Sequence, residues 1–280
     1  MSDAPDPLPT PQEDRVDLRD PAVLTLLQRG KIDITGRMVD ASNATLFGTV
    51  SGDGETLQCV YKPVRGERPL WDFPDGTLAG REVASYLVSE AAGWHVVPPT
   101  ILRGTGPFGP GMLQAWVDTD TTDGLVDVCS PKAVPKGWRR VLRARDGEGS
   151  PAVLAHADDP RLRAMAAFDV VVNNADRKGG HVLAGDDGRV YGVDHGLTMH
   201  TEDKLRTVLW GWVGEQLAEA EIEALSRLRA ELAGTLEDDL GPHVTLTEIR
   251  TLTERVDLLL AVPLFPEPSG YGPAIPWPAF

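Results

Sequence analysis

The chain has 280 residues, with 27 basic and 42 acidic side chains and a formal net charge of −15. Hydrophobic residues make up 41% and charged residues 25%, which is typical of a globular chain that forms one large domain or two lobes. So large an acidic excess argues against nucleic-acid binding, which needs basic side chains to neutralise phosphates, and against stable association with an anionic membrane surface.

Three further features concern location. Two cysteines, Cys59 and Cys129, are too few for a disulfide framework, which favours a reducing compartment. Residues 1–17 are rich in proline and acid and lack the regions of a signal peptide, and the apolar stretch 258–262 is far too short to span a membrane. We therefore expect a cytoplasmic protein, and the scarcity of lysine beside arginine is typical of GC-rich bacterial genomes.

The first part of the chain predicts a disordered tail, residues 1–19, followed by a β-rich N-lobe over residues 20–118. The tail holds prolines and acidic side chains with little to bury. Asp20 followed by Pro21 predicts the start of a helix that ends at Gly30. The other expected elements are strands at 32–38, 45–50 and 57–62, a hairpin turn at 51–54, a helix at 81–92, and strands at 101–102 and 111–117.

The second part, residues 119–280, predicts a mainly helical C-lobe. Residues 119–159 are polar and rich in turn residues, and we interpret them as a linker or insertion. Helices are expected at 159–172, 218–232 and 246–260, and Thr245 with Glu248 forms a capping box for the last. The six prolines after residue 262 predict an extended tail. The predicted fold class is therefore α+β in two lobes.

Two runs of polar residues are the most informative part of the sequence: Asn-Asn-Ala-Asp-Arg-Lys-Gly-Gly-His from residue 173 and Val-Asp-His-Gly from residue 193. Between them, Asp187-Gly188 favours a two-residue hairpin turn, which would pair residue i with residue 375 − i. His181 would then lie opposite Asp194, and the loop with Asp176 would enter the same end of the hairpin. Converging carboxylates and a further polar ligand suit a hydrated Mg²⁺ that bridges phosphates, although a simple Ca²⁺ site is an alternative.

This pattern resembles the catalytic loop and the metal-binding Asp-x-Gly of the protein-kinase-like fold. The likeness is greatest to the atypical phosphatidylinositol 3-/4-kinase branch, including a small actinobacterial family related to it, and extends over residues 43–212. The resemblance implies that Lys62 holds the α- and β-phosphates of ATP and that Glu82 pairs with this lysine. It also implies that Asp176 orients or deprotonates the acceptor hydroxyl and that Asp194 binds Mg²⁺.

The resemblance implies further contacts and also shows departures. The implied nucleotide-binding residues are Asn43 in the phosphate-covering turn and, in the hinge between the lobes, Gln114, Ala115, Trp116 and Val117. The turn lacks the Gly-x-Gly-x-x-Gly of ordinary protein kinases, as in many atypical kinases. His181 stands where the fold normally has asparagine as a second metal ligand, and imidazole is a softer ligand than an amide oxygen. With His181 at this position, three outcomes are open: a changed metal preference, a site for one metal ion, or a weak or inactive kinase.

Three functions are therefore compatible with the sequence. The first is an ATP- and Mg²⁺-dependent phosphotransferase, with Mn²⁺ as an alternative metal and with Lys62 and Asp176 in catalysis. The others are a nucleotide-binding pseudokinase that acts as a scaffold and an enzyme of the same fold that transfers AMP. We expect the hydroxyl acceptor to be a protein or a small molecule rather than a lipid, because no basic membrane-facing helix is present. Lys204 and Arg206 fall in the expected activation segment, where they either contact an anionic acceptor or form surface ion pairs.

Overall fold

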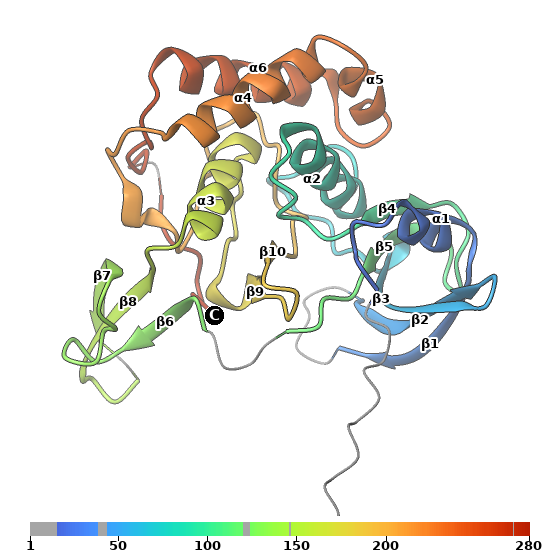
Figure 1. The fold of residues 1–280 in the computed structure, drawn as a ribbon, viewed down its shortest axis with the longest axis horizontal. Helices are drawn as coiled ribbons and strands as arrows, with labels where there is room; N and C mark the ends of the chain where they lie inside the picture. Colours follow the sequence, from blue (N-terminus) through green and yellow to red (C-terminus); the bar gives the residue numbers. More distant parts are fainter. Residues whose placement is uncertain (1–15, 39–43, 120–123, 146, 271) are drawn as a thin grey trace, which may run out of the picture.

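The structure, a computed structural model, describes residues 16–38, 44–119, 124–145, 147–270 and 272–280. An antiparallel sheet forms one end of the molecule, helices its middle, and a small second sheet the other end (Figure 1). The fold is therefore α+β, with an antiparallel N-terminal sheet and a helical C-terminal region, as the sequence predicts. Residues 1–15 of the predicted tail lie outside the described residues.

The N-terminal sheet has five strands in the order β1-β2-β3-β5-β4. Its strands are β1 (Lys31–Arg37), β2 (Leu46–Gly52), β3 (Glu55–Pro63), β4 (Thr100–Arg103) and β5 (Gly111–Ala115). Asp53 and Gly54 connect β2 to β3 with φ angles of 54° and 88°, the left-handed pair that a type I′ hairpin turn requires. The predicted strands and the predicted turn are thus present, with ends that differ by a few residues.

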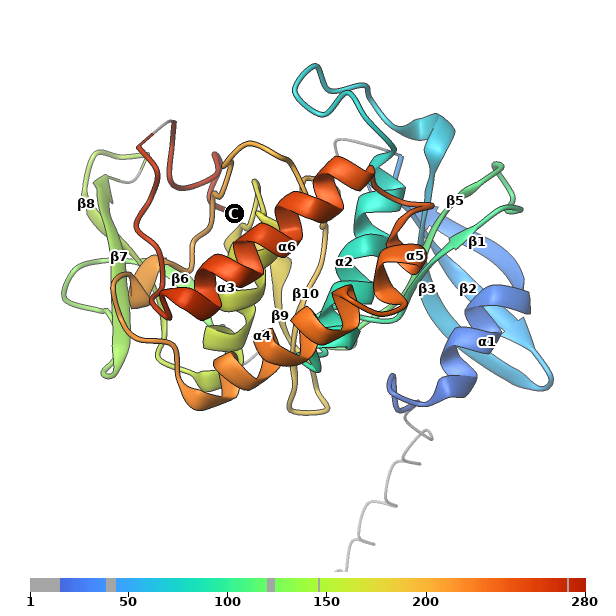
Figure 2. The same ribbon diagram turned by 90° about the horizontal axis from the view of Figure 1, so that it is seen from above.

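Two helices accompany this sheet. In α1 (Pro21–Arg29), the Asp20 carboxylate caps the first turn by accepting a hydrogen bond from the Ala22 amide, 2.8 Å long. The longer α2 (Leu78–Ala92) is capped by Thr77 at its start and by a left-handed Gly93 at its end. It lies between the sheet and the C-terminal helices (Figure 2). It therefore contacts both halves of the molecule.

Residues 119–159, interpreted from sequence as a linker or insertion, are folded in their described part, so the linker alternative is wrong. This segment forms a three-stranded antiparallel sheet in the order β6-β8-β7, made of β6 (Val126–Cys129), β7 (Trp138–Arg145) and β8 (Pro151–Ala157). The central strand β8 is mostly buried and built partly from alanine, and the edge strand β7 is mostly exposed and rich in arginine. Neither strand shows the apolar alternation that marks a strand in sequence, because pairing and tertiary packing supply the stability instead.

Helices dominate the rest of the chain. They are α3 (Pro160–Val172), α4 (Glu219–Leu232), α5 (Leu236–Leu240) and α6 (Leu246–Ala261), of which the short α5 was not predicted. The capping box of α6 is present, because Thr245 and Glu248 each accept a hydrogen bond from the other's backbone amide. Within the described ranges, no helix is long and apolar enough to cross a membrane.

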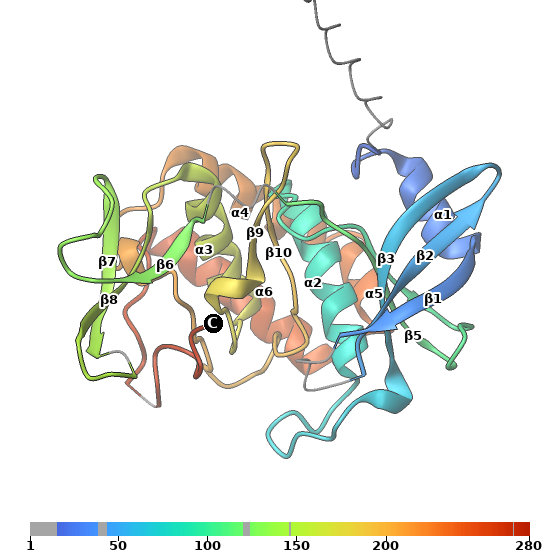
Figure 3. The same cartoon turned by 90° about the horizontal axis from the view of Figure 1, so that it is seen from below.

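The last segment, 263–280, lies against the loops of the C-terminal region and contains no helix or named strand in its described part. The Thr207 amide donates to the Ala274 carbonyl, and the Gly179 amide donates to the Ala279 carbonyl. The predicted extended tail therefore packs along the loops that carry the site. A hairpin of β9 (Val182–Ala184) and β10 (Val190–Gly192) lies between α2 and α3 in the same region (Figure 3).

Candidate active site

Lys62, Glu82 and Asp194 come together from three elements. Lys62 lies near the end of β3, Glu82 near the start of α2, and Asp194 just after β10. The Lys62 Nζ atom is 2.6 Å from Glu82 Oε1 and 2.8 Å from Asp194 Oδ1. Glu82 is buried, whereas the Asp194 side chain is 52% exposed. One ammonium thus joins the sheet, the helix and the hairpin, and an exposed carboxylate stands at the open side of the cluster.

Charge and burial set the protonation states of this cluster. Burial alone lowers the pKa of Lys62, but the carboxylates of Asp194 and Glu82 outweigh it and raise the pKa above its ordinary value. The Lys62 ammonium holds the pKa of Asp194 well below its usual range, and burial raises the pKa of Glu82. Lys62 is therefore a cation and Asp194 an anion at neutral pH.

The β9–β10 hairpin differs from the expected register. Val190 pairs with Ala184 and Gly192 with Val182, so paired residue numbers add to 374 instead of 375. The loop has three residues, and only its last, Gly188, takes a left-handed φ of 79°. His181 therefore lies opposite Val193, whose amide donates to the His181 carbonyl, and the predicted pairing with Asp194 is wrong.

His181 and Asp194 nevertheless meet. Asp194 has a left-handed φ of 61°, which is unusual for this residue, and its Oδ2 lies 3.5 Å from His181 Nε2. The His181 Nδ1 faces the Asp176 carbonyl at 3.0 Å, and because a carbonyl only accepts, Nδ1 carries the proton. Burial lowers the pKa of His181 to about 4, so its Nε2 presents a bare lone pair to the carboxylate at neutral pH.

This donor pair fits a divalent cation. The His181 Nε2 lone pair and the Asp194 Oδ2 atom lie 3.5 Å apart with no proton between them. Two ligands that each bind one ion at about 2.0–2.2 Å are separated by a similar distance. In the described residues, no group of three or more histidine, cysteine, aspartate and glutamate side chains is placed to hold a metal alone. An ion here would need oxygens from a substrate, as Mg²⁺ often takes from phosphates.

Asp176 lies beside His181 and Asp194 and forms an ion pair with Lys178. Its Oδ2 is 3.2 Å from the Lys178 Nζ, and its amide donates to Asn174 Oδ1 at 3.0 Å. Burial raises the pKa of Asp176, against the opposing effect of Lys178. Sequence analysis gave Lys178 no role, although residues i and i+2 share a face where the backbone is extended, as it is at Arg177.

Arg177, in the loop of residues 173–181, forms a buried ion pair with Asp169 of α3 that the sequence did not reveal. Arg177 donates to Asp169 of α3 through Nε at 3.0 Å and Nη2 at 2.8 Å, and both side chains are 0% exposed. Asn174 and Thr207 also donate to the Asp169 carboxylate. Arg177 Nη2 lies 2.6 Å from His195 Nε2, which accepts because arginine only donates. The sequence signal that could have indicated this pair was Asp169, a charged residue among the apolar residues of a predicted helix.

A second missed pair fixes α2. Arg81 is buried and donates to Glu248 of α6 at 2.6 Å and to the Thr198 carbonyl at 2.7 Å. Ser85 and Thr198 share a further hydrogen bond of 3.0 Å. Because Arg81 precedes Glu82, these contacts with the C-terminal region also hold the glutamate that pairs with Lys62.

The predicted hinge residues follow one another at the end of β5. The Gln114 side chain is buried and donates to Thr100 Oγ1 at 2.8 Å, so it is used inside the protein, and Ala115 and Val117 are also buried. Trp116 is half-buried and packs edge-on against Phe47, with ring centroids 4.9 Å apart. Asn43 lies outside the described residues. The nucleotide-binding roles of all five residues stay predictions.

Comparison with known proteins places this geometry in context. No protein-family model matches the chain. Protein Rv2133c of Mycobacterium tuberculosis is 52% identical over 264 residues, which cover 91% of this chain and 94% of that protein.

Solved structures bear on the fold. The Golgi casein kinase with Mn/ADP bound gives a TM-score of 0.53 at 13% identity and covers 87% of this chain and 75% of that one. The Helicobacter pylori proinflammatory kinase CtkA gives a TM-score of 0.39 at 10% identity, with 85% of this chain and 94% of that chain covered, which is too low to bear on the fold. The first likeness shows a kinase-like fold, and the special likeness to phosphatidylinositol 3-/4-kinases stays a prediction.

Proposed function

We propose that this chain, which belongs to the family of the Mycobacterium tuberculosis protein Rv2133c, is a kinase that transfers the γ-phosphoryl group of ATP to a hydroxyl acceptor. One observation carries the proposal: within a kinase-like fold, Lys62 bridges the buried Glu82 and the exposed Asp194. A lysine held this way keeps its charge and stands where it can neutralise phosphate oxygens.

The metal would be held by Asp194 and His181, with phosphate oxygens and water completing its ligands. A divalent ion bound there would neutralise the charge of the phosphates. The likeness to the Golgi casein kinase structure with Mn/ADP bound supports the use of a nucleotide with such an ion. Both Mg²⁺ and Mn²⁺ are candidates, and the histidine ligand favours Mn²⁺ over Mg²⁺.

Asp176 would act on the acceptor. Its carboxylate orients the hydroxyl and takes the proton as the oxygen forms its bond to the γ-phosphorus, the bond from that phosphorus to the β-bridging oxygen breaks, and ADP leaves. Lys178, 3.2 Å from Asp176, would offset charge on the transferred group. Catalysis would then come mainly from positioning and charge stabilisation, as in other phosphoryl transfers.

The finer parts of the proposal rest on the residue pattern. The order of Lys62, Glu82, Asp176 with Arg177, and Asp194 supports a relationship to the phosphatidylinositol 3-/4-kinase branch. A net charge of −15 favours a protein or small-molecule acceptor over a membrane lipid. Both cysteines are free, which supports a reducing compartment such as the cytoplasm.

One observation favours a second candidate, a nucleotide-binding pseudokinase: His181 replaces the amide ligand that active kinases of this fold normally use. Binding and transfer must therefore be measured separately. We would titrate purified protein with ADP and Mn²⁺ by calorimetry, and follow α- and γ-labelled ATP in parallel with mass spectrometry of the products, including the protein itself.

Asp176→Asn should reduce γ-phosphoryl transfer by about 100-fold or more and leave nucleotide affinity within about twofold, because the carboxylate acts on the acceptor. Lys62→Met should weaken nucleotide binding. Arg143→Gln, on the exposed face of β7, is the matched control and should change neither. Nucleotide binding without any transfer would favour the pseudokinase, incorporation of the α-label would indicate AMP transfer, and unchanged transfer by Asp176→Asn would refute the assignment.

A further inference from the structure

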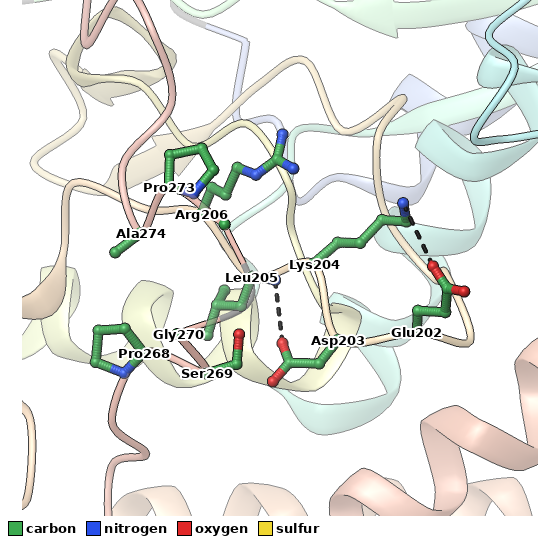
Figure 4. Close-up of a pocket in the computed structure, with 11 residues that line it drawn as sticks. Glu202, Asp203, Lys204, Leu205, Arg206, Pro268, Ser269, Gly270, Pro273 and Ala274 are labelled. Carbon is green, nitrogen blue, oxygen red and sulfur yellow. Dashed lines mark hydrogen bonds and ion pairs between the residues drawn. The ribbon is translucent and has the colours of Figure 1, made fainter.

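A cavity of about 470 Å³ lies in the C-terminal region, and Figure 4 shows the residues that line it. Its walls are residues 202–206, which follow the Asp-His-Gly run, and residues 268–274 of the final segment apart from 271. The Arg206 amide donates to the Asn174 carbonyl at 2.9 Å, and the Arg177 amide donates to the Arg206 carbonyl at 3.0 Å. Arg206 is therefore fixed against the residues that flank Asp176 on both sides.

The cations around this cavity differ in their partners. Lys204 lies 3.4 Å from Asp72 and 3.6 Å from Glu202, and Lys178 is paired with Asp176. Arg206 is half-buried, and its guanidinium makes no hydrogen bond or ion pair with any residue that the structure describes. Its side chain runs past Pro273 and away from the nearby acidic side chains at 202 and 203 (Figure 4).

An unpaired guanidinium at this place points to a ligand. The five N–H donors of the Arg206 guanidinium are partly removed from water and have no acceptor among the described residues of the protein. This desolvation costs free energy, which a bound anion would offset. Arg206 is also close enough to Asp176 to oppose the rise of its pKa. A molecule held by Arg206 would therefore stand next to the carboxylate that receives the acceptor proton.

We infer that Arg206 is a specificity-determining residue that binds an anionic group, a phosphate or a carboxylate, on a small hydroxyl-bearing acceptor. The inference rests on the proposed function and names the substrate class of that site. The planar guanidinium fork matches both oxyanions in bidentate fashion. A cavity of about 470 Å³ suits a small molecule, since ligand sites usually occupy about 300–1,000 Å³. In a chain with a net charge of −15, a local cation is also needed to attract an anion.

The test measures anion binding on the acceptor side alone. The protein is first saturated with Mn²⁺ and a non-hydrolysable ATP analogue, so that the γ-phosphate position is filled. Inorganic phosphate and, in a separate arm, malonate are then titrated by calorimetry, which distinguishes a phosphate-selective site from a carboxylate-selective one. The variants are Arg206→Gln, Arg206→Lys, which keeps the charge but not the fork, and the exposed control Arg143→Gln.

Wild type and the Arg143→Gln control should bind at least one of the two anions with equal affinity. Arg206→Gln should weaken that binding by about tenfold or more and Arg206→Lys by less, with unchanged thermal unfolding. Absence of anion binding at millimolar concentrations, or equal binding by wild type and Arg206→Gln, would overturn the inference. If the ATP analogue itself does not bind, the proposed function fails, and the same titrations on the nucleotide-free protein still decide whether Arg206 binds anions.

Discussion

Replacing Arg177 by methionine should lower the free energy of unfolding by about 3–5 kcal/mol, the usual result of breaking a buried ion pair by removing one partner. Arg177 and Asp169 are 0% exposed and joined by hydrogen bonds of 2.8, 3.0 and 3.2 Å, so the remaining carboxylate would stay buried without its counter-ion. The His181 and Val193 carbonyls would each lose a weaker donor at 3.3 Å. Two other side chains still donate to Asp169, which keeps the loss within this range.

Urea unfolding of four proteins tests this reasoning: wild type, Arg177→Met, Asp169→Leu and the double variant. The double variant should lose less stability than the sum of the single changes, because neither buried charge is then left alone. Arg229→Met, which breaks an exposed ion pair of 2.6 Å to Asp257, is the control and should cost about 0–1 kcal/mol. A loss below about 1 kcal/mol for Arg177→Met, or additive losses in the double variant, would refute the argument.

Three further predictions follow from the site. Burial lowers the pKa of His181 from 6.5 to about 4, so the unfolded chain binds the proton first; the stabilising contribution is complete above pH 6.5 and is lost as pH falls toward 4. Urea unfolding at several pH values should therefore show that the free energy of unfolding falls less with decreasing pH for His181→Gln than for wild type, by up to about 3 kcal/mol. His181→Asn should raise the affinity for ADP with Mg²⁺ relative to ADP with Mn²⁺, and calorimetry showing an unchanged ratio would count against histidine as a ligand. Gly179→Ala should cost less than about 1 kcal/mol in urea unfolding, because the Phe280 ring that the new methyl group would overlap is 50% exposed and can move aside, and a cost above about 3 kcal/mol would contradict this reasoning.

The sequence was most informative where local signals agree with the fold. Lys62 ends a predicted strand, Glu82 lies in a predicted helix and Asp194 follows a predicted hairpin, and the structure brings these three side chains together. The register of that hairpin could not be settled from sequence. An Asp-Gly pair suits a two-residue turn, but its glycine equally suits the left-handed end of a three-residue loop, and Gly188 takes the second arrangement.

Contacts between buried charged residues of different elements could not be predicted from sequence for a different reason. Arg81 and Glu248 are 167 positions apart, and the paired Asp169 and Arg177 occupy a helix and a loop. Each residue alone reads as an ordinary charged side chain, because the cost of burial that demands a partner exists only after folding. The sheet of β6, β7 and β8 was missed for a related reason, since its exposed arginine-rich edge resembles a loop in sequence.

The contacts of α2 bear on whether the site can switch off by moving this helix. Rotating α2 far enough to separate Glu82 from Lys62 would also remove Arg81 from Glu248 and from the Thr198 carbonyl. The charged groups would then be left in a buried environment without their partners, a loss comparable to breaking the Arg177 pair, about 3–5 kcal/mol. A state that costs this much is populated less than about one per cent of the time. The Lys62–Glu82 pair is therefore built into the resting fold, and rotation of α2 is too costly to regulate the proposed kinase.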